Sequence, residues 1–411
     1  MALQNLQSAH ITGKTVFLRV DVNVPITDKG TIGDTYRIEA LLPSLHYILD
    51  QGCKVIIGSH LGRPTKYRED ALSLRPVAEA LAHMLGIKFV ATDKRAPDYP
   101  VRHVVFFNGS LTEATTRKLL GEMSPKDIIF LENLRYYPGE EKNDPKFAET
   151  LASLADIYVN DAFAVSHRQA ASIVGITKYL PSYCGIEFEQ EVKNLRAVLH
   201  TPKHPFIVLM GGIKISDKEK TLQTLAEKAD TVLLGGGLAN LFFLSRGFEV
   251  GLSKLESDSV KLAFQMDKNY KQKFILPEDV VVANAHMDPS SIRVTPPFGV
   301  GKRELILDLG PKSILKFSKI LKTAKTIVWN GPLGRFETKP FDTATMALAK
   351  IVGAVSKGKA FGVVGGGETV DAVRLAGQAN FIDHVSTGGG AMLEFLADGT
   401  LPGILALESA K

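Results

Sequence analysis

The sequence has few of the features that mark a secreted, metal-stabilised or membrane-spanning protein. Its 411 residues include only two cysteines, Cys53 and Cys184, too few for a disulfide framework or a zinc site. No apolar run approaches the roughly 20 residues that a membrane-spanning helix requires. The first ten residues lack the basic segment followed by an apolar one that is typical of a secretory signal. We therefore expect a cytoplasmic protein without a membrane partner.

The charge pattern argues against a nucleic-acid partner. The formal net charge is +5, which is mild for a chain of this length. There is no long basic run, and no aromatic platform lies among basic residues. This pattern fits small anionic ligands better than nucleic acid.

The usual nucleotide-binding motifs are missing as well. The pattern Gly-x-Gly-x-x-Gly fails at Gly235, because Asn240 stands where the third glycine should be. The P-loop pattern fails at residues 301–302, because Pro296 and Arg303 occupy other required positions. A standard dinucleotide fold and a standard P-loop are therefore both disfavoured.

The chain is long enough for two or three domains. The segment 185–202 has apolar residues at helical spacing and is bounded by Gly185 and Pro202. These apolar residues are Phe188, Val192, Leu195 and Leu199. The segment is either an ordinary surface helix or a helix that separates two domains. Strand-like runs before it end in Arg, His, Asp and Asn, whereas those after it end in glycine clusters, so we interpret it as a helix that joins two domains.

In the first half, short β-branched runs alternate with helical periodicity, which is typical of a parallel α/β sheet. The strand-like runs are 15–20, 54–58, 127–131 and 156–159. Ligands of such sheets bind beyond the carboxyl ends of the strands. Basic residues stand near these ends or at a nearby helix start, namely Arg37, His60, Arg63, Arg135 and Arg168. Any single arginine could be a solvated or salt-bridged side chain, but together their planar forks indicate a pocket for a phosphate or carboxylate.

In the second half, four strand-like runs end in glycine clusters. The clusters are 211–212, 235–237, 365–367 and 388–390, and a helix-compatible stretch follows each one. Glycine lets a ligand approach main-chain N–H groups, and a helix N-terminus adds partial positive charge. The alternative is a set of tight turns without a ligand. Four clusters in one half favour an anion site.

Two details point to phosphate transfer. Lys214 and Lys218 follow the first cluster, and we expect one in the loop and one on the first turn of a helix. A lysine is a point charge that can follow a moving phosphoryl group. Glu368 and Thr369 follow the third cluster, where the carboxylate could either cap the helix or help to hold Mg²⁺.

At this level of detail the chain resembles phosphoglycerate kinases over almost its whole length. The matching motifs are 19–25 (RVDVNVP), 59–64 (SHLGRP), 131–135 (LENLR), 158–163 (YVNDAF), 235–240 (GGGLAN), 329–332 (WNGP) and 385–390 (VSTGGG). Residues 138–144 (PGEEKND) are similar to bacterial members of the family.

The resemblance implies an α/β protein of two Rossmann-like lobes with parallel sheets, joined by a central helix and hinge. It implies a 3-phosphoglycerate-binding lobe at 1–184, an interdomain helix at 185–202, a nucleotide-binding lobe at 203–390 and a C-terminal segment, 391–411, that returns to the first lobe. The implied reaction is the reversible transfer of phosphate from 1,3-bisphosphoglycerate to ADP, giving 3-phosphoglycerate and ATP in glycolysis, with Mg²⁺. We expect a monomer that bends at a hinge near the helix ends and Ser386-Thr387.

The resemblance also implies a role for individual residues. Arg37 and Lys214 would be catalytic. The 3-phosphoglycerate site would consist of Asp21, Asn23, Arg37, His60, Arg63, Arg135 and Arg168. The nucleotide site would consist of Gly212, Lys214, Lys218, Gly236, Gly237, Asn330, Pro332, Glu337, Gly366, Gly367, Glu368 and Thr369. Glu368 would contact the metal, directly or through water.

Some positions depart from the family pattern. Glu368 stands where the family normally has Asp, and its extra methylene would move the carboxylate by roughly 1 Å, which matters for an octahedral ion. Residues 164–166 replace the usual Gly-Thr-Ala, Ile213 replaces Ala, and Arg335 replaces an apolar residue. One competing hypothesis is therefore a catalytically weak nucleotide-binding protein. A nicotinamide-dependent dehydrogenase is a second, disfavoured by the missing fingerprint.

Overall fold

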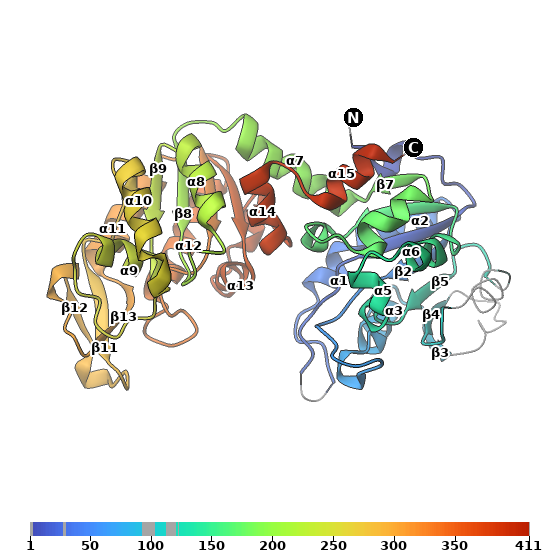
Figure 1. Cartoon of the computed structure of the whole chain (residues 1–411), viewed down its shortest axis with the longest axis horizontal. Coiled ribbons are helices and arrows are strands. Elements are labelled where there is room, and N and C mark those ends of the chain that lie inside the picture. Colours follow the sequence, from blue (N-terminus) through green and yellow to red (C-terminus); the bar gives the residue numbers. More distant parts are fainter. Residues whose placement is uncertain (1–2, 28–29, 93–102, 112–120, 122, 411) are drawn as a thin grey trace. The chain divides into compact units, whose positions relative to one another are not determined.

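The computed structural model describes residues 3–27, 30–92, 103–111, 121 and 123–410. The chain divides into two compact units, one of residues 1–192 with 400–411 and one of residues 193–399. Figure 1 shows the helices and strands that make up each unit.

The first unit contains a parallel sheet with seven strands among its described residues, in the order β3-β4-β5-β2-β1-β6-β7. The strands are β1 (Thr15–Val20), β2 (Lys54–Gly58), β3 (Lys88–Thr92), β4 (His103–Phe107), β5 (Ile128–Leu131), β6 (Ile157–Asp161) and β7 (Ser182–Cys184). The four runs expected from the first half are confirmed as β1, β2, β5 and β6. The inner strands are almost wholly buried, as a parallel sheet covered on both faces requires.

Helices pack around this sheet, and one of them comes from the end of the chain. Among the residues described in this unit, the α-helices are α1 (Tyr36–Ala40), α2 (Leu42–Asp50), α3 (Arg75–Met84), α5 (Pro138–Glu141), α6 (Pro145–Ala152) and α15 (Pro402–Ser409). Helix α15 lies against β7 and the single helical turn η5 (Ala171–Gly175), and it is drawn in red in Figure 1. Ile404 and Leu407 bury its apolar face, so the last helix belongs to the core of the first unit.

The second unit contains a six-stranded parallel sheet in the order β10-β9-β8-β14-β15-β16. Its strands are β8 (Phe206–Met210), β9 (Thr231–Leu234), β10 (Phe274–Ile275), β14 (Thr326–Asn330), β15 (Phe361–Gly365) and β16 (His384–Val385). Its helices of at least four residues are α8 (Glu219–Lys228), α9 (Gly236–Ser245), α10 (Val260–Tyr270), α11 (Pro311–Leu321), α12 (Thr343–Ser356), α13 (Gly367–Leu375) and α14 (Gly390–Asp398). All four strand-like runs of the second half are confirmed.

A small antiparallel sheet in the second unit was not expected from the sequence. It has the order β12-β11-β13, with β11 (Val280–Asn284), β12 (Arg293–Thr295) and β13 (Glu304–Leu309). The valine-rich strand β11 pairs with both neighbours, and a register irregularity lies between Val281 and Val282.

Helix α7 (Ile186–His200) confirms the helix expected at 185–202. Its four apolar residues, Phe188, Val192, Leu195 and Leu199, are all buried. The boundary between the two units falls inside this helix, between Val192 and Lys193. The helix is therefore the covalent link through which the chain leaves one unit and enters the other.

In both parallel sheets the strand order reverses at the first strand, so that later strands are added on both of its sides. In the first unit β1 has β2 on one side and β6 on the other, and in the second unit β8 lies between β9 and β14. Open α/β sheets bind ligands at the carboxyl ends of the strands next to such a switch. These two edges are where the predicted site residues lie.

Among the described helices, none alone is long and apolar enough to cross a membrane, and α14 with α15 is the one broken pair that passes on length and composition together.

Candidate functional site

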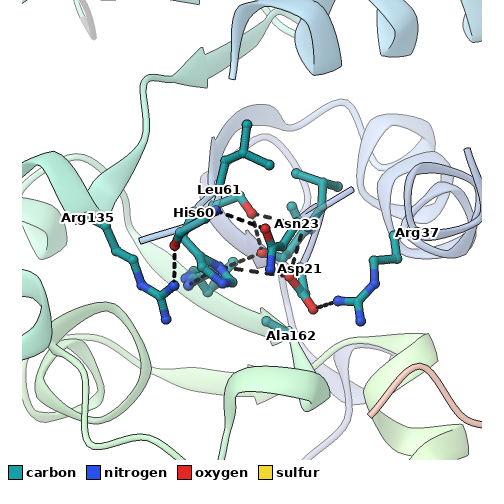
Figure 2. A network of polar contacts seen from close by, with 12 residues as sticks. Asp21, Asn23, Arg37, His60, Leu61, Arg135 and Ala162 are labelled. Carbon is teal, nitrogen blue, oxygen red and sulfur yellow. Dashed lines mark hydrogen bonds and ion pairs between the residues drawn. The ribbon is translucent and has the colours of Figure 1, made fainter. Parts of the chain in front are cut away.

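The carboxyl edge of the first sheet brings most of the predicted substrate residues together. Asp21 and Asn23 follow β1, His60 follows β2, and Arg37 lies in the first turn of α1. Arg135 lies in the short turn η3 (Leu134–Tyr136) after β5. Figure 2 shows Arg37 beside Asp21 on one side and Arg135 near His60 on the other.

Asp21 is the central anion of this group. Its carboxylate is mostly buried and forms an ion pair with the guanidinium of Arg37, whose side chain is 30% exposed. Its other oxygen lies 3.8 Å from Nδ1 of His60. Asp21 therefore holds Arg37 in place at the edge of the cluster, where its side chain is partly exposed.

Asn23 and Arg135 hold the loop after β2 from its two sides. The backbone N–H of Gly62 donates to Oδ1 of Asn23 at 2.9 Å, and Arg135 Nη1 donates to the carbonyl of Gly62 at 2.5 Å. The buried Asn133 adds a third tie by donating to the carbonyl of Leu61 at 2.7 Å. The backbone that carries His60 and Arg63 is thus fixed by side chains from two other loops.

Arg63 differs from the other predicted basic residues of the first unit in being exposed. Within the described residues it forms neither a hydrogen bond nor an ion pair. It directly follows Gly62, so its backbone position is set by the contacts of Asn23 and Arg135. Its guanidinium is free to bind a ligand, whereas its attachment point is held in place.

Sequence reasoning missed a buried arginine beneath this surface. Arg19 on β1 is 2% exposed, its Nε donates to Ser172 Oγ at 2.8 Å, and its Nη2 lies 4.0 Å from Glu140 Oε1. Nη2 also lies 3.5 Å from His60 Nδ1. A charged residue inside the apolar run of β1 was the available signal. Arg19 contacts the imidazole of His60 and belongs to the same positive cluster.

His60 is neutral at physiological pH. Burial lowers its pKa well below the ordinary value, and the positive charges of Arg19 and Arg135 lower it further. Arg37 and Arg168 act in the same direction. A neutral imidazole at this place can donate one hydrogen bond to an anion without adding a further buried charge.

The positive charge of the edge comes from its arginines. Burial lowers the pKa of Arg135 to about 10, which leaves the group protonated at neutral pH. Its Nε lies 3.2 Å from the exposed Glu141. Arg168 is half-buried and, with Arg19 and Arg135, lines a cavity of about 450 Å³. Several guanidinium groups that converge on one edge favour a polyanionic ligand.

The carboxyl edge of the second sheet is built from main chain. The N–H of Gly211 donates to the carbonyl of Asn330 at 2.9 Å, and the N–H of Gly212 donates to Pro332 at 2.9 Å. The N–H of Gly236 donates to Leu333 at 2.9 Å. Three of the strand ends, those of β8, β9 and β14, are therefore joined by backbone hydrogen bonds that leave little space for side chains.

Two glycines here are required by geometry. Gly331 has a φ of +89°, and a Cβ atom at this position would lie 2.3 Å from the carbonyl oxygen of Gly211. Gly366 has a φ of +94°, and its Cβ would lie 2.8 Å from Nδ2 of Asn330. Any other residue would be strained and would push the strand ends apart.

Two neighbouring cavities open at this edge, and every predicted nucleotide residue lines one of them. The first, of about 160 Å³, has apolar walls and is lined by Gly212, Gly236, Gly237, Pro332, Glu337 and Glu368. The second, of about 790 Å³, is lined by Gly212, Lys214, Lys218, Asn330, Gly366, Gly367, Glu368 and Thr369. Gly212 and Glu368 border both. The first cavity suits a flat apolar group, and the second, which is lined by two lysines, suits a polyanion.

The two lysines lie in the loop before α8. Lys214 is exposed, and Lys218 is half-buried at the N-cap position. The expectation that one lysine would lie on the first turn of the helix was wrong by one residue, because α8 begins at Glu219. Burial lowers the pKa of Lys218, and the charges of Asp217, Glu368 and Glu256 oppose this shift.

Glu368 has a free carboxylate at the start of α13. Among the described residues no hydrogen bond to its side chain is formed, so it does not cap the helix through a side-chain bond. The described residues contain no group of three or more His, Cys, Asp and Glu side chains that could hold a metal. A single carboxylate fits Mg²⁺, which keeps several waters and is bound through one or two carboxylates plus substrate phosphates.

Arg335 extends the charge of this edge. Its Nε lies 3.3 Å from Glu337 Oε1, and both residues line the apolar-walled cavity. Arg335 is half-buried, with Nη1 3.3 Å from the sulfur of Met287. The position that departs from the family pattern therefore lies at the cavity wall.

The comparisons with known proteins agree with this geometry. The phosphoglycerate kinase family model matches residues 6–399. The chain is 41% identical over 411 residues to the phosphoglycerate kinase of Desulforudis audaxviator, and the alignment covers 100% of both chains. It is 40% identical to phosphoglycerate kinase 1, chloroplastic, of Arabidopsis thaliana, over 99% of this chain and 82% of that one. The solved phosphoglycerate kinase of Coxiella burnetii is similar in structure, with a TM-score of 0.83, 34% identity and 100% coverage of both chains.

Proposed function

The chain belongs to the phosphoglycerate kinase family, and we propose how its described residues share the work of that family's reaction. The chain is an enzyme of glycolysis that transfers phosphate reversibly between 1,3-bisphosphoglycerate and ADP. The assignment of residues to substrates, the metal and the mechanism below are our proposal.

The first unit binds 3-phosphoglycerate or 1,3-bisphosphoglycerate. The observation that supports this most is that three arginines converge on His60 at one sheet edge. The positive charges of all three lower the pKa of His60, namely those of Arg37, Arg135 and Arg168. His60, Arg63, Arg135 and Arg168 hold the remote phosphate. Asp21 and Asn23 hold the hydroxyl and carboxylate region. Arg37 is catalytic, because Asp21 holds it at the partly open side of the cluster.

The second unit binds ADP or ATP. The apolar-walled cavity takes the base and ribose, with Gly236 and Gly237 against the base and Glu337 at the ribose. The larger cavity takes the phosphates, which Lys214 and Lys218 meet from one side. Gly366, Gly367 and Thr369 meet them from the other side, where α13 begins and contributes N–H groups and partial positive charge.

We assign the metal contact to Glu368, directly or through water. Its carboxylate accepts no hydrogen bond within the described chain, and it lines both cavities. When bound, Mg²⁺ supplies charge neutralisation at the nucleotide phosphates. The longer side chain of Glu, compared with the usual Asp, favours an outer contact through water.

The chain's own residues align the reactants and compensate charge. A carboxylate nucleophile is already ionised at neutral pH, so no general base is required. Arg37 and Lys214 stabilise negative charge on the transferring phosphoryl oxygens. The two substrates are held by different units, so we propose that turnover includes a step in which the substrates are brought together. We also propose that the enzyme acts as a monomer in the cytoplasm.

The direct test is an assay of the purified chain with ATP, Mg²⁺ and 3-phosphoglycerate, followed by detection of the acyl phosphate. Turnover that falls strongly in Lys214→Ala, while the protein keeps its fold, supports the assignment. An unchanged rate in Lys214→Ala removes this lysine from the catalytic residues. Nucleotide binding without turnover in the unaltered chain would favour the competing hypothesis of a weak binding protein.

A further inference from the structure

The segment that carries the two lysines has few backbone ties of its own. We call residues 213–218 the lysine loop. Its preceding end is held where Gly212 donates to Pro332, and its far end is held where the carbonyl of Lys218 accepts from the N–H of Leu222 in α8 at 2.7 Å. Within the loop, the N–H of Lys218 donates to the carbonyl of Ile215 at 2.8 Å. Between these ties the loop crosses the rim of the phosphate cavity. Something else has to hold its centre.

A carboxylate from a distant segment fills this role. Glu256 Oε2 accepts hydrogen bonds from the N–H groups of Ile215 and Ser216, at 3.0 and 2.9 Å. Its Oε1 accepts from the hydroxyl of Ser216 at 2.6 Å. One side chain thus satisfies two consecutive backbone donors and one hydroxyl in the loop directly after Lys214.

The charge of Glu256 strengthens these contacts. The hydrogen bonds from Ser216 and Ile215 lower the pKa of Glu256, so the carboxylate is ionised at neutral pH. Hydrogen bonds to an ionised acceptor are roughly twice as strong as neutral ones. The same charge opposes the lowering of the pKa of Lys218 that burial causes, and so favours the protonated lysine.

Given the nucleotide site proposed above, we propose that Glu256 is a positioning residue for phosphate binding, which holds the lysine loop so that Lys214 and Lys218 meet the nucleotide phosphates. Glu256 lines neither of the two cavities of the nucleotide site. It acts through the backbone of Ile215 and Ser216. Ile215 is fully buried, which gives the loop a second anchor beside the carboxylate.

If Glu256 served only to stabilise the local fold, its loss would disturb the turn that follows it. Glu256 precedes the short turn η7 (Ser257–Ser259), and Ser259 N–H donates to its backbone carbonyl at 2.9 Å. That backbone contact survives any change of the side chain, whereas the hydrogen bond between the Ser259 side chain and the carboxylate does not. Loss of the carboxylate should therefore free the lysine loop while η7 and the sheet remain intact.

The test compares Glu256→Ala and Glu256→Gln with the control Asp258→Asn, which changes an exposed carboxylate in the adjacent turn. We expect Glu256→Ala to raise the KM for ATP about tenfold and to lower kcat, and Glu256→Gln to have a smaller effect because its amide oxygen can still accept. The KM for 3-phosphoglycerate should stay unchanged, because its site lies in the other unit. Asp258→Asn should behave like the unaltered enzyme.

Hydrogen exchange supplies a readout that does not depend on turnover. In the ligand-free protein, the amides of Ile215 and Ser216 should exchange at least tenfold faster in Glu256→Ala, with β8 and β14 unchanged. Normal exchange at these two amides, or an equal rise in KM for both substrates, would overturn the proposal. If the unaltered chain had no turnover at all, the proposed function would fail, whereas the exchange result would still decide how the loop is held.

Discussion

At the scale of single residues, the site of the first unit depends on how Asp21 is shared. Its carboxylate pairs with Arg37 and approaches the neutral His60 at 3.8 Å. The Arg37 side chain is 30% exposed, so a ligand can reach it from solvent. An arginine held in this way offers a planar pair of donors that lysine cannot reproduce.

We therefore expect Arg37→Ala to lower kcat by about a hundredfold, since removal of one donor to a developing charge typically costs a factor of about 10² to 10³. Arg37→Lys should recover only part of this loss. The control is Arg293→Ala, which breaks an exposed ion pair with Glu304 in the second unit. Steady-state kinetics with varied 3-phosphoglycerate measure the effect. Full activity in Arg37→Ala would exclude a catalytic role for this residue.

A buried carboxyl in the second unit makes stability depend on pH. Asp308, in β13, accepts hydrogen bonds from the N–H groups of Leu309 and Ala344 at 2.9 and 3.0 Å. Burial nonetheless raises its pKa to about 7. The folded chain therefore keeps this proton up to near pH 7, whereas the unfolded chain loses it near pH 4. Stability contributed by the protonated group is lost as the pH rises through this window.

Asp308→Asn removes the titrating group. Relative to the unaltered protein, the free energy of unfolding of the variant should rise by about 1 kcal/mol or more between pH 5 and pH 8. Denaturant unfolding at both pH values, followed by the fluorescence of the buried Trp329 in the same unit, measures this difference. The same difference at both pH values would show that Asp308 does not titrate in this range.

At the scale of elements, the last helix supports the segment that carries Arg168. Gly403 in α15 is buried, and its N–H donates to the carbonyl of Ser166 at 2.8 Å. A Cβ atom on Gly403 would lie 2.7 Å from Cβ of Ser166 and 3.0 Å from Cγ2 of Ile173. The close approach of this helix therefore depends on the absence of a side chain.

Gly403→Ala should destabilise the first unit by about 1 to 2 kcal/mol, because overpacking outweighs the better helix propensity of alanine. Leu405→Ala, at a residue 52% exposed on the same helix, is the matched control and should change stability little. Thermal unfolding of both variants gives the comparison. A Gly403→Ala variant as stable as the control would mean that α15 shifts outward without cost.

At the scale of the whole molecule, each parallel sheet has one switch point and one group of ligand-binding residues. Arginine and histidine side chains make up the first group, and backbone N–H groups with two lysines make up the second. We propose that the two groups differ because a small phosphorylated acid presents charge on all sides. A nucleotide instead presents a flat base beside its phosphates.

The separation predicts distinct footprints in hydrogen exchange. 3-Phosphoglycerate alone should slow exchange most in residues 19–25 and 59–63, and ATP with Mg²⁺ alone should slow it most in residues 211–218 and 330–337. At a ligand concentration of 100 times Kd the protection can reach about 2.7 kcal/mol, or roughly a hundredfold in rate. Mass spectrometry of peptic peptides measures both footprints. Strongest protection by ATP in residues 19–25 would contradict the assignment.

The sequence alone was sufficient for the features that depend on neighbouring residues. The eight strand-like runs, the helix before Pro202 and the residue types at the strand ends were all predictable, because periodicity and turn chemistry are local. The family followed from long motifs. The lysine at the start of α8 was misplaced by one residue, since helix ends are weakly marked in sequence.

Tertiary structure alone decided the contacts between segments that are distant in the chain. Neighbouring residues do not indicate the order of the strands, the antiparallel sheet of β11, β12 and β13, or the pairing of Arg19 with Glu140. Glu256 reaches Ser216 across 40 residues, and Arg19 reaches Ser172 across 153. Such pairings are determined by how buried polar groups find partners once the sheets have formed. Local pattern therefore determined which groups lie at the carboxyl edges of the sheets, and the packed fold determined what holds those groups in place.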